Sequence, residues 1–121
     1  MKAPRGSRRS NAQIGGLLTI GTHYVIINGH SKLICWSEEK NALLTESRGV
    51  GFERAAVKIE QLDYIALVEH WNRRRYPHQW VFVLEIDGYA YYVPFVETDD
   101  KIFLKTMMPS RQAKRRYLRG N

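Results

Sequence analysis

The sequence predicts an α+β fold in which a small antiparallel β-meander packs with two helices from the first half of the chain and one basic helix at its end. Two dipeptides that favour tight hairpin turns, Asn28–Gly29 and Asp87–Gly88, each lie between apolar runs. Apolar residues at the helical spacing i, i+3, i+4 and i+7 occupy Phe52–Ile59. The continuously apolar run Trp80–Leu84 indicates a central strand that is covered on both faces.

The first half of the chain is predicted to form a hairpin followed by two helices. The hairpin joins Tyr24–Ile27 to Leu33–Trp36 through its Asn-Gly turn. Ser37 is placed to cap a helix that runs to about Ser47, because a serine oxygen accepts a backbone N–H of the first turn. Two glutamates directly after Ser37 suit the positive end of that helix. Two glycines then separate it from the helix with the apolar stripe.

The second half is predicted to be β-rich until the last helix. A polar loop separates the first two of its four strands, which are Tyr64–Val68, Trp80–Leu84, Tyr89–Val96 and Ile102–Met108. Pro94 implies a sheet edge or a bulge, since proline cannot donate a hydrogen bond to a β-ladder. Ser110 is placed to cap the final basic helix.

Charge is the feature of the composition that bears most on function. The chain of 121 residues has 19 Lys and Arg against 12 Asp and Glu, which gives a net charge of +7. Clustered cations favour a polyanionic partner, because phosphate contacts release counterions. Residues 1–13 hold four of these cations and no acid, and we expect them to form a disordered arm. No apolar run approaches about 18 residues, so no membrane partner is expected.

The cysteine and histidine content argues against several kinds of site. The single cysteine, Cys35, fits a reducing compartment, and we expect a cytoplasmic location. Because Cys35 lies in an apolar run, a buried structural thiol is favoured over a nucleophile. The four histidines do not have the spacing of metal ligands, and no glycine-rich phosphate loop is present. We therefore expect neither a metal ion nor another cofactor.

Near the end of the chain, an apolar strand with one lysine, Lys105, leads into an arginine-rich helix. At 100° per residue, three arginines of this helix fall within about 80° of one another: Arg111, Arg115 and Arg119. Ala113 and Tyr117 lie on the opposite side, so one face can pack on a core while the other presents guanidinium groups. Guanidinium groups beside a lysine and the positive end of a helix suit a phosphate.

Three segments resemble the BrnT family, the toxins of bacterial type II toxin–antitoxin systems: Trp36–Asn41, Arg48–Glu53 and Ile102–Tyr117. The resemblance implies a BrnT-like toxin domain over residues 33–119, after an extension over residues 1–32 that carries the strand Tyr24–Ile27. It also implies a RelE-like fold, ribonuclease activity on RNA such as mRNA, inhibition of translation, and neutralisation by a small antitoxin of the ribbon-helix-helix type. One loop departs from the family, because it reads His-Trp-Asn at 70–72 where we expect His-Pro-Asn.

The resemblance further implies metal-independent cleavage, in which a ribose 2′-hydroxyl attacks the adjacent phosphate and leaves a cyclic phosphate and a 5′-hydroxyl. If its face of the strand borders a groove, Lys105 stabilises the phosphorane; otherwise it snorkels at a sheet edge. Arg111 either clamps phosphate bidentately or is a solvated helix charge. His78 and His70 are either proton shuttles or ordinary loop residues. Tyr117 either transfers a proton or packs in the core, and its spacing favours packing.

The residues expected to bind RNA are Arg73, Arg74, Arg75, Arg115 and Arg119. The first three precede Tyr76, and charge beside an aromatic ring suits single-stranded RNA, although a solvated loop has the same composition. The sequence has no unmistakable general base. Two other functions therefore stay open: a non-catalytic basic module that binds nucleic acid or an acidic partner segment, and a degenerate toxin.

Overall fold

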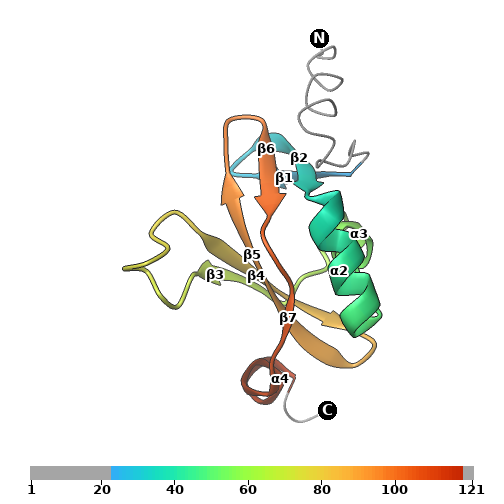
Figure 1. Cartoon of the computed structure of the whole chain (residues 1–121). Coiled ribbons are helices and arrows are strands. Elements are labelled where there is room, and N and C mark those ends of the chain that lie inside the picture. Colours follow the sequence, from blue (N-terminus) through green and yellow to red (C-terminus); the bar gives the residue numbers. More distant parts are fainter. Residues whose placement is uncertain (1–22, 119–121) are drawn as a thin grey trace.

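The computed structural model describes residues 23–118 and confirms the predicted α+β class (Figure 1). Its elements are β1 (Tyr24–Ile27), β2 (His30–Trp36), α2 (Glu38–Arg48), α3 (Phe52–Glu60), β3 (Ala66–Glu69), β4 (Trp80–Ile86), β5 (Tyr89–Glu97), β6 (Lys101–Leu104), β7 (Met108–Pro109) and α4 (Arg111–Tyr117). The arm predicted over residues 1–13 and the RNA-binding residue predicted at Arg119 lie outside the described residues.

The strands form one seven-stranded sheet with the order β1-β2-β6-β5-β4-β3, and β7 pairs with β5. The meander from β3 to β6 is antiparallel throughout, as predicted. One pair was not predicted: β2 runs parallel to β6, with Leu33 opposite Lys101. This pair joins the N-terminal hairpin to the meander. The domain boundary predicted between residues 32 and 33 falls inside β2, and β1 belongs to the same sheet.

Both predicted hairpin turns have the backbone that their sequences favour. Asn28 and Gly29 have φ angles of 53° and 81°, and Asp87 and Gly88 have 55° and 80°. A two-residue turn with positive φ at both positions matches the right-handed twist of the strands it joins. The registers of β1–β2 and β4–β5 therefore follow from the turns.

Helices α2 and α3 lie on one face of the sheet and enclose the main core (Figure 1). Alternate residues of the strands point to this face, so the Phe82 and Phe95 rings stack with centroids 4.6 Å apart. At the helical side of the core, Trp36 stacks on Phe52 at 5.9 Å. The intervening residues of β5, Tyr92 and Pro94, point to the other face of the sheet.

Asn41 joins α2 to α3. Its buried side-chain oxygen accepts the backbone N–H of Phe52 at 2.6 Å, and its amide donates to Glu53 at 2.7 Å. Because α3 begins after Gly51, which has no side chain to cap it, Asn41 supplies the cap. A Cβ at position 51 would lie 2.6 Å from the Asn41 oxygen and from the Thr45 hydroxyl, so glycine is required there.

The strand predicted over Ile102–Met108 is interrupted, which is a correction to the sequence analysis. Phe95 pairs with Leu104, whereas Tyr92 pairs with Met108, so two residues of β5 face three residues between β6 and β7. This one-residue bulge lies opposite Pro94, whose carbonyl accepts the Lys105 N–H at 2.8 Å. Lys105 is therefore in the bulge and not in mid-strand. The bulge expected from Pro94 is present.

Candidate functional site

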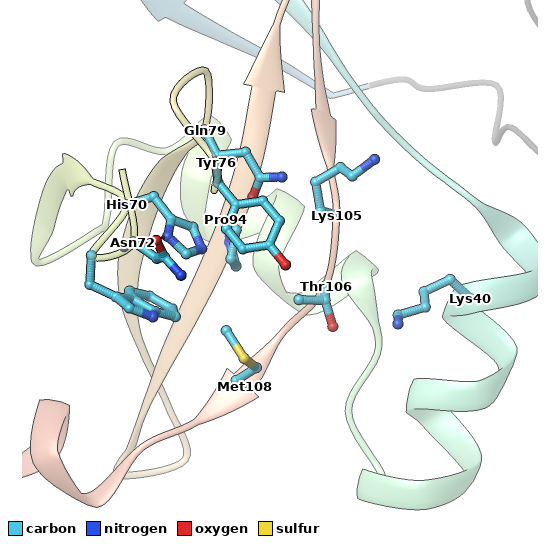
Figure 2. A pocket seen from close by; sticks show the side chains of 10 residues that line it. Lys40, His70, Asn72, Tyr76, Gln79, Pro94, Lys105, Thr106 and Met108 are labelled. Carbon is cyan, nitrogen blue, oxygen red and sulfur yellow. Dashed lines mark hydrogen bonds between the residues drawn. The ribbon is translucent and has the colours of Figure 1, made fainter. Parts of the chain in front are cut away.

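A pocket of about 450 Å³ opens beside the bulge (Figure 2). One wall is the loop of residues 70–79 between β3 and β4, the floor contains β5 and β7, and the other wall comes from the bulge and the start of α2. The lining residues are Lys40, His70, Trp71, Asn72, Tyr76, Gln79, Pro94, Lys105, Thr106 and Met108. Its volume lies in the range of sites that take small ligands.

Backbone hydrogen bonds fold the 70–79 loop back on itself. The His70 N–H donates to the Gln79 carbonyl at 3.2 Å, which continues the β3–β4 ladder into the loop. At the tip, the Asn72 side-chain oxygen accepts the Arg75 N–H at 3.2 Å, and the Asn72 carbonyl accepts the Tyr76 N–H at 2.9 Å. Asparagine favours such a turn because its side chain bonds to nearby backbone. The turn brings Tyr76 back over His70.

His70 is the most enclosed titratable group in the pocket wall, since only 6% of its surface is exposed. Its Nδ1 accepts the backbone N–H of Asn72 at 3.0 Å. Burial lowers the pKa of His70 below the ordinary value of 6.5. A neutral imidazole whose Nδ1 accepts a hydrogen bond carries its proton on Nε2. His70 is thereby held as a neutral donor.

Aromatic rings surround the His70 imidazole. Trp71 stacks on it with centroids 4.1 Å apart, and Tyr76 tilts against it at 4.7 Å. Trp71 also contacts the ring of Tyr92 on the floor strand at 5.1 Å. Figure 2 shows the Tyr76 hydroxyl pointing into the pocket. This wall is therefore a rigid aromatic surface with polar groups at defined places.

Two lysines, Lys40 and Lys105, line the opposite wall; Figure 2 shows the Lys40 ammonium group pointing toward Thr106 and the Lys105 ammonium group directed away from His70. Lys105 projects from the bulge, with its Nζ 5.4 Å from the centroid of the Phe103 ring. Lys40 lies in the first turns of α2, which the parallel β2–β6 pair places next to the end of β6. Within residues 23–118 neither ammonium group has a salt bridge. Their positive charge is available to an anionic ligand.

The three arginines predicted to bind RNA in the loop do not line the pocket, although they lie in the sequence between two residues that do, Asn72 and Tyr76. Arg73 pairs with Glu69 at 3.3 Å, and the Arg75 guanidinium lies 5.6 Å from the centroid of the Tyr76 ring. Arg74 is exposed. This part of the loop is therefore basic, and the Glu69 carboxylate offsets part of its charge.

The remaining predicted site residues do not line the pocket. His78 is exposed on the same loop. Arg111, Arg115 and Tyr117 lie on α4, beyond β7, and do not line the pocket that Lys105 lines. The predicted cap is present, because the Ser110 hydroxyl oxygen accepts the Ala113 N–H at 3.0 Å. Ala113 is buried and Tyr117 is partly buried, while the basic residues of α4 are exposed.

Sequence reasoning did not assign a role to Lys40, Asn72, Thr106 or Met108. Lys40 belongs to a segment that resembles BrnT, but its approach to Lys105 depends on the parallel pair. The signal that could have led to the pocket is Pro94, since bulges often lie beside functional sites.

Other kinds of site have little support in the described part of the chain. No group of three or more His, Cys, Asp and Glu residues comes together there as a metal site. Burial raises the pKa of the Cys35 thiol to about 11, which leaves it protonated and a poor nucleophile. None of the helices over residues 23–118 is long and apolar enough to span a membrane.

Comparison of the chain with protein families, with curated proteins and with solved structures gives no match. The resemblance to BrnT therefore rests on the residues quoted for it.

Proposed function

We propose that the protein is an RNA endonuclease that cleaves by attack of a ribose 2′-hydroxyl, and that the pocket beside the bulge is its active site. The observation that carries the proposal is the pair of ammonium groups without salt bridges, Lys40 and Lys105, across the pocket from a neutral imidazole. Positive charge fixed in advance where negative charge develops is the largest contribution to many such reactions.

The reaction places separate demands on the site. The 2′-oxygen loses its proton and bonds to phosphorus, and the bond from phosphorus to the 5′-oxygen breaks. The products are a 2′,3′-cyclic phosphate and a 5′-hydroxyl, which takes up a proton. Negative charge grows on the non-bridging oxygens of the phosphorane before the bond breaks. The site must therefore supply cations and a proton donor for the leaving oxygen, while the proton of the 2′-hydroxyl passes to a solvent water molecule.

The lining residues divide these tasks. Lys105 and Lys40 neutralise the phosphorane from their wall of the pocket. Because His70 Nδ1 already accepts the Asn72 N–H, the His70 Nε2–H is the group that donates a hydrogen bond to the RNA from the opposite wall. The Tyr76 hydroxyl, which points into the pocket, is the donor for the 5′-oxygen (Figure 2). His78 and Tyr117 are not needed in this assignment, and Arg111 and Arg115 bind RNA outside the pocket.

We further propose that this activity is that of a RelE-like, BrnT-type toxin in the bacterial cytoplasm. It would act on mRNA to inhibit translation, and a small ribbon-helix-helix antitoxin would neutralise it. The support is the resemblance over Trp36–Asn41, Arg48–Glu53 and Ile102–Tyr117 together with the net charge of +7. Induced without its antitoxin, the chain should arrest bacterial growth. Normal growth with soluble protein present would contradict the toxin assignment.

The test of cleavage uses the purified chain and a single-stranded oligoribonucleotide. We expect products that end in a cyclic phosphate, formed equally well with EDTA present. A single 2′-deoxy nucleotide at the mapped cleavage position should abolish cleavage of that phosphodiester bond, because the attacking oxygen is missing. Cleavage that survives this substitution, or that EDTA stops, would contradict the mechanism.

A non-catalytic basic module is the second candidate. The exposed arginines and lysine of α4 favour it, because they form a basic surface away from the pocket. Such a module would bind nucleic acid or an acidic partner segment without breaking a bond. Tight binding of RNA with no cleavage product over a long incubation would favour it over the enzyme.

A further inference from the structure

Trp71 is an unusual residue for an exposed loop. Its indole is 58% exposed, although a large aromatic ring gains free energy from burial. Its orientation is nevertheless fixed, by the stack on His70 at 4.1 Å and by the Tyr92 ring at 5.1 Å. A ring that is held in place and still mostly open to solvent is ready to stack on another flat group.

We propose that Trp71 binds one unpaired nucleobase by stacking, and that it thereby restricts the pocket to single-stranded RNA. The inference depends on the proposed binding of RNA in this pocket and names the form of RNA that it takes. Stacking of a base on an aromatic side chain is sequence-tolerant, because every base has a π-face. In a duplex both faces of a base are covered by its neighbours, so none is offered to Trp71.

The charges around Trp71 favour a nucleotide over a peptide. The lysines Lys40 and Lys105 line the same pocket, and Arg74 and Arg75 follow Trp71 in the loop. A nucleotide presents a flat base and a phosphate at adjacent positions, which matches an indole flanked by cations. An acidic peptide segment would satisfy the cations but would leave the open indole without a flat partner.

A second exposed tryptophan offers an internal comparison. Trp80 is 39% exposed and borders a different hollow, where its neighbours include Ile27, Leu67 and Glu97. The described residues that line this hollow include a carboxylate and no lysine or arginine, so the hollow lacks the cations that bind phosphate. Trp36 is buried, so Trp71 and Trp80 are the exposed tryptophans of the described chain.

Binding of a non-cleavable probe tests the inference. The probe is a fluorescent single-stranded 2′-O-methyl RNA, compared with the same sequence closed into a duplex. Trp71→Ala should weaken binding of the single strand about 5- to 150-fold, which corresponds to a stacking free energy of roughly 1–3 kcal/mol per base. Trp71→Phe should restore most of the affinity, and Trp80→Ala should bind like the wild type. Thermal melting of each variant checks that the fold is retained.

The base itself can be removed from the probe without any change to the protein. One abasic position should weaken wild-type binding as much as Trp71→Ala does, and the two changes together should not add, because they remove the same contact. Tryptophan emission should be quenched on binding in Trp80→Phe but not in Trp71→Phe. Additive losses, equal affinity for duplex, or a quench that survives in Trp71→Phe would each overturn the inference.

These results separate the inference from the proposed function. If Trp71→Ala binds and cleaves RNA like the wild type, the inference fails while the endonuclease stands. If the quench and the affinity loss are found but no ribo-oligonucleotide is cut, Trp71 stacking stands and the endonuclease fails. No binding of the probe, or Trp71-dependent binding of an acidic peptide alone, would overturn the inference.

Discussion

The pocket beside the bulge and the helix α4 are both basic, but they hold their cations differently. In the pocket, Lys40 and Lys105 come from elements that are distant in the sequence and share a cavity with His70. On α4, the cations are neighbours in the sequence and are all exposed around the buried Ala113. Charge density along a chain therefore does not locate a site, because chemistry needs cations that converge in space around a partly dehydrated ligand.

The largest expected effect is the difference in cleavage rate between two variants, each of which replaces one cation by alanine, in the pocket or on α4. Lys105→Ala should reduce the rate of RNA cleavage at least about a hundredfold, because it removes charge next to the phosphorane. Arg111→Ala should change the rate several-fold at most, since Arg111 does not line the pocket. Both residues are exposed, so the melting temperature should change little in either variant.

Single-turnover cleavage by the two purified variants measures this difference. Lys101→Ala is the matched control, because Lys101 begins β6, the strand that leads into the bulge, but pairs with Asp100 at 3.9 Å outside the pocket. A larger loss in Arg111→Ala than in Lys105→Ala would move the active site to α4. That result would support the sequence-based prediction over the pocket.

A drop in pH should lower the stability and the cleavage activity that depend on the pocket but should not affect α4, because, of these two regions, the pocket has the histidine whose pKa is lowered. Between the lowered folded-state pKa and the ordinary value of 6.5, the unfolded chain binds more protons at His70 than the folded chain does. The free energy of unfolding should therefore fall as pH drops below about 6.5. Cleavage should decline at lower pH, as the lowered folded-state pKa is approached, because a proton added to Nδ1 breaks the hydrogen bond from Asn72.

Urea unfolding from pH 5 to 8 measures this effect in three proteins. His70→Gln should lose part of the pH dependence that the wild type shows. His78→Gln, a change at an exposed residue of the same loop, should retain it. A wild type whose stability rises on acidification through this range would contradict the burial argument for His70.

The smallest effect is expected on α4. Arg115→Ala should weaken RNA binding modestly for every sequence and reduce the salt slope by about one phosphate contact, because an exposed arginine contributes mainly counterion release. Lys114→Ala is the control, since the Lys114 ammonium lies over the ring of Tyr89 at 5.4 Å. Affinities across a salt series measure both. An unchanged slope in Arg115→Ala would show that α4 does not touch the RNA backbone.

The sequence could predict features that depend on a few adjacent residues. Asn28–Gly29 and Asp87–Gly88 adopt the positive φ values that hairpin turns need, and Ser37 and Ser110 both cap helices. In these cases the local conformational preference and the tertiary structure agree. Pro94 predicted a sheet edge or a bulge for the same kind of reason, since a missing N–H cannot be supplied from elsewhere, and the structure has the bulge.

The candidate site could not be predicted in the same way, because it depends on contacts between distant residues. The run Ile102–Met108 is apolar enough to be one strand, and only the register against β5 shows that it is broken at Lys105. Lys40 enters the pocket through the β2–β6 pair, for which the sequence has no local signal. Of the four residues predicted to be catalytic, Lys105 alone lines the pocket.

The parallel β2–β6 pair also has a consequence for folding kinetics. The β4–β5 hairpin closes through two residues, whereas 67 residues lie between Leu33 and its partner Lys101. The entropy of loop closure grows with loop length, so distant strand pairs form late and slow the folding of the whole domain. The 70–79 loop and the bulge form together with the local meander. Lys40 reaches the pocket only when the distant strands β2 and β6 pair. A complete chain that refolds from denaturant should therefore form one wall of the pocket before Lys40 joins it.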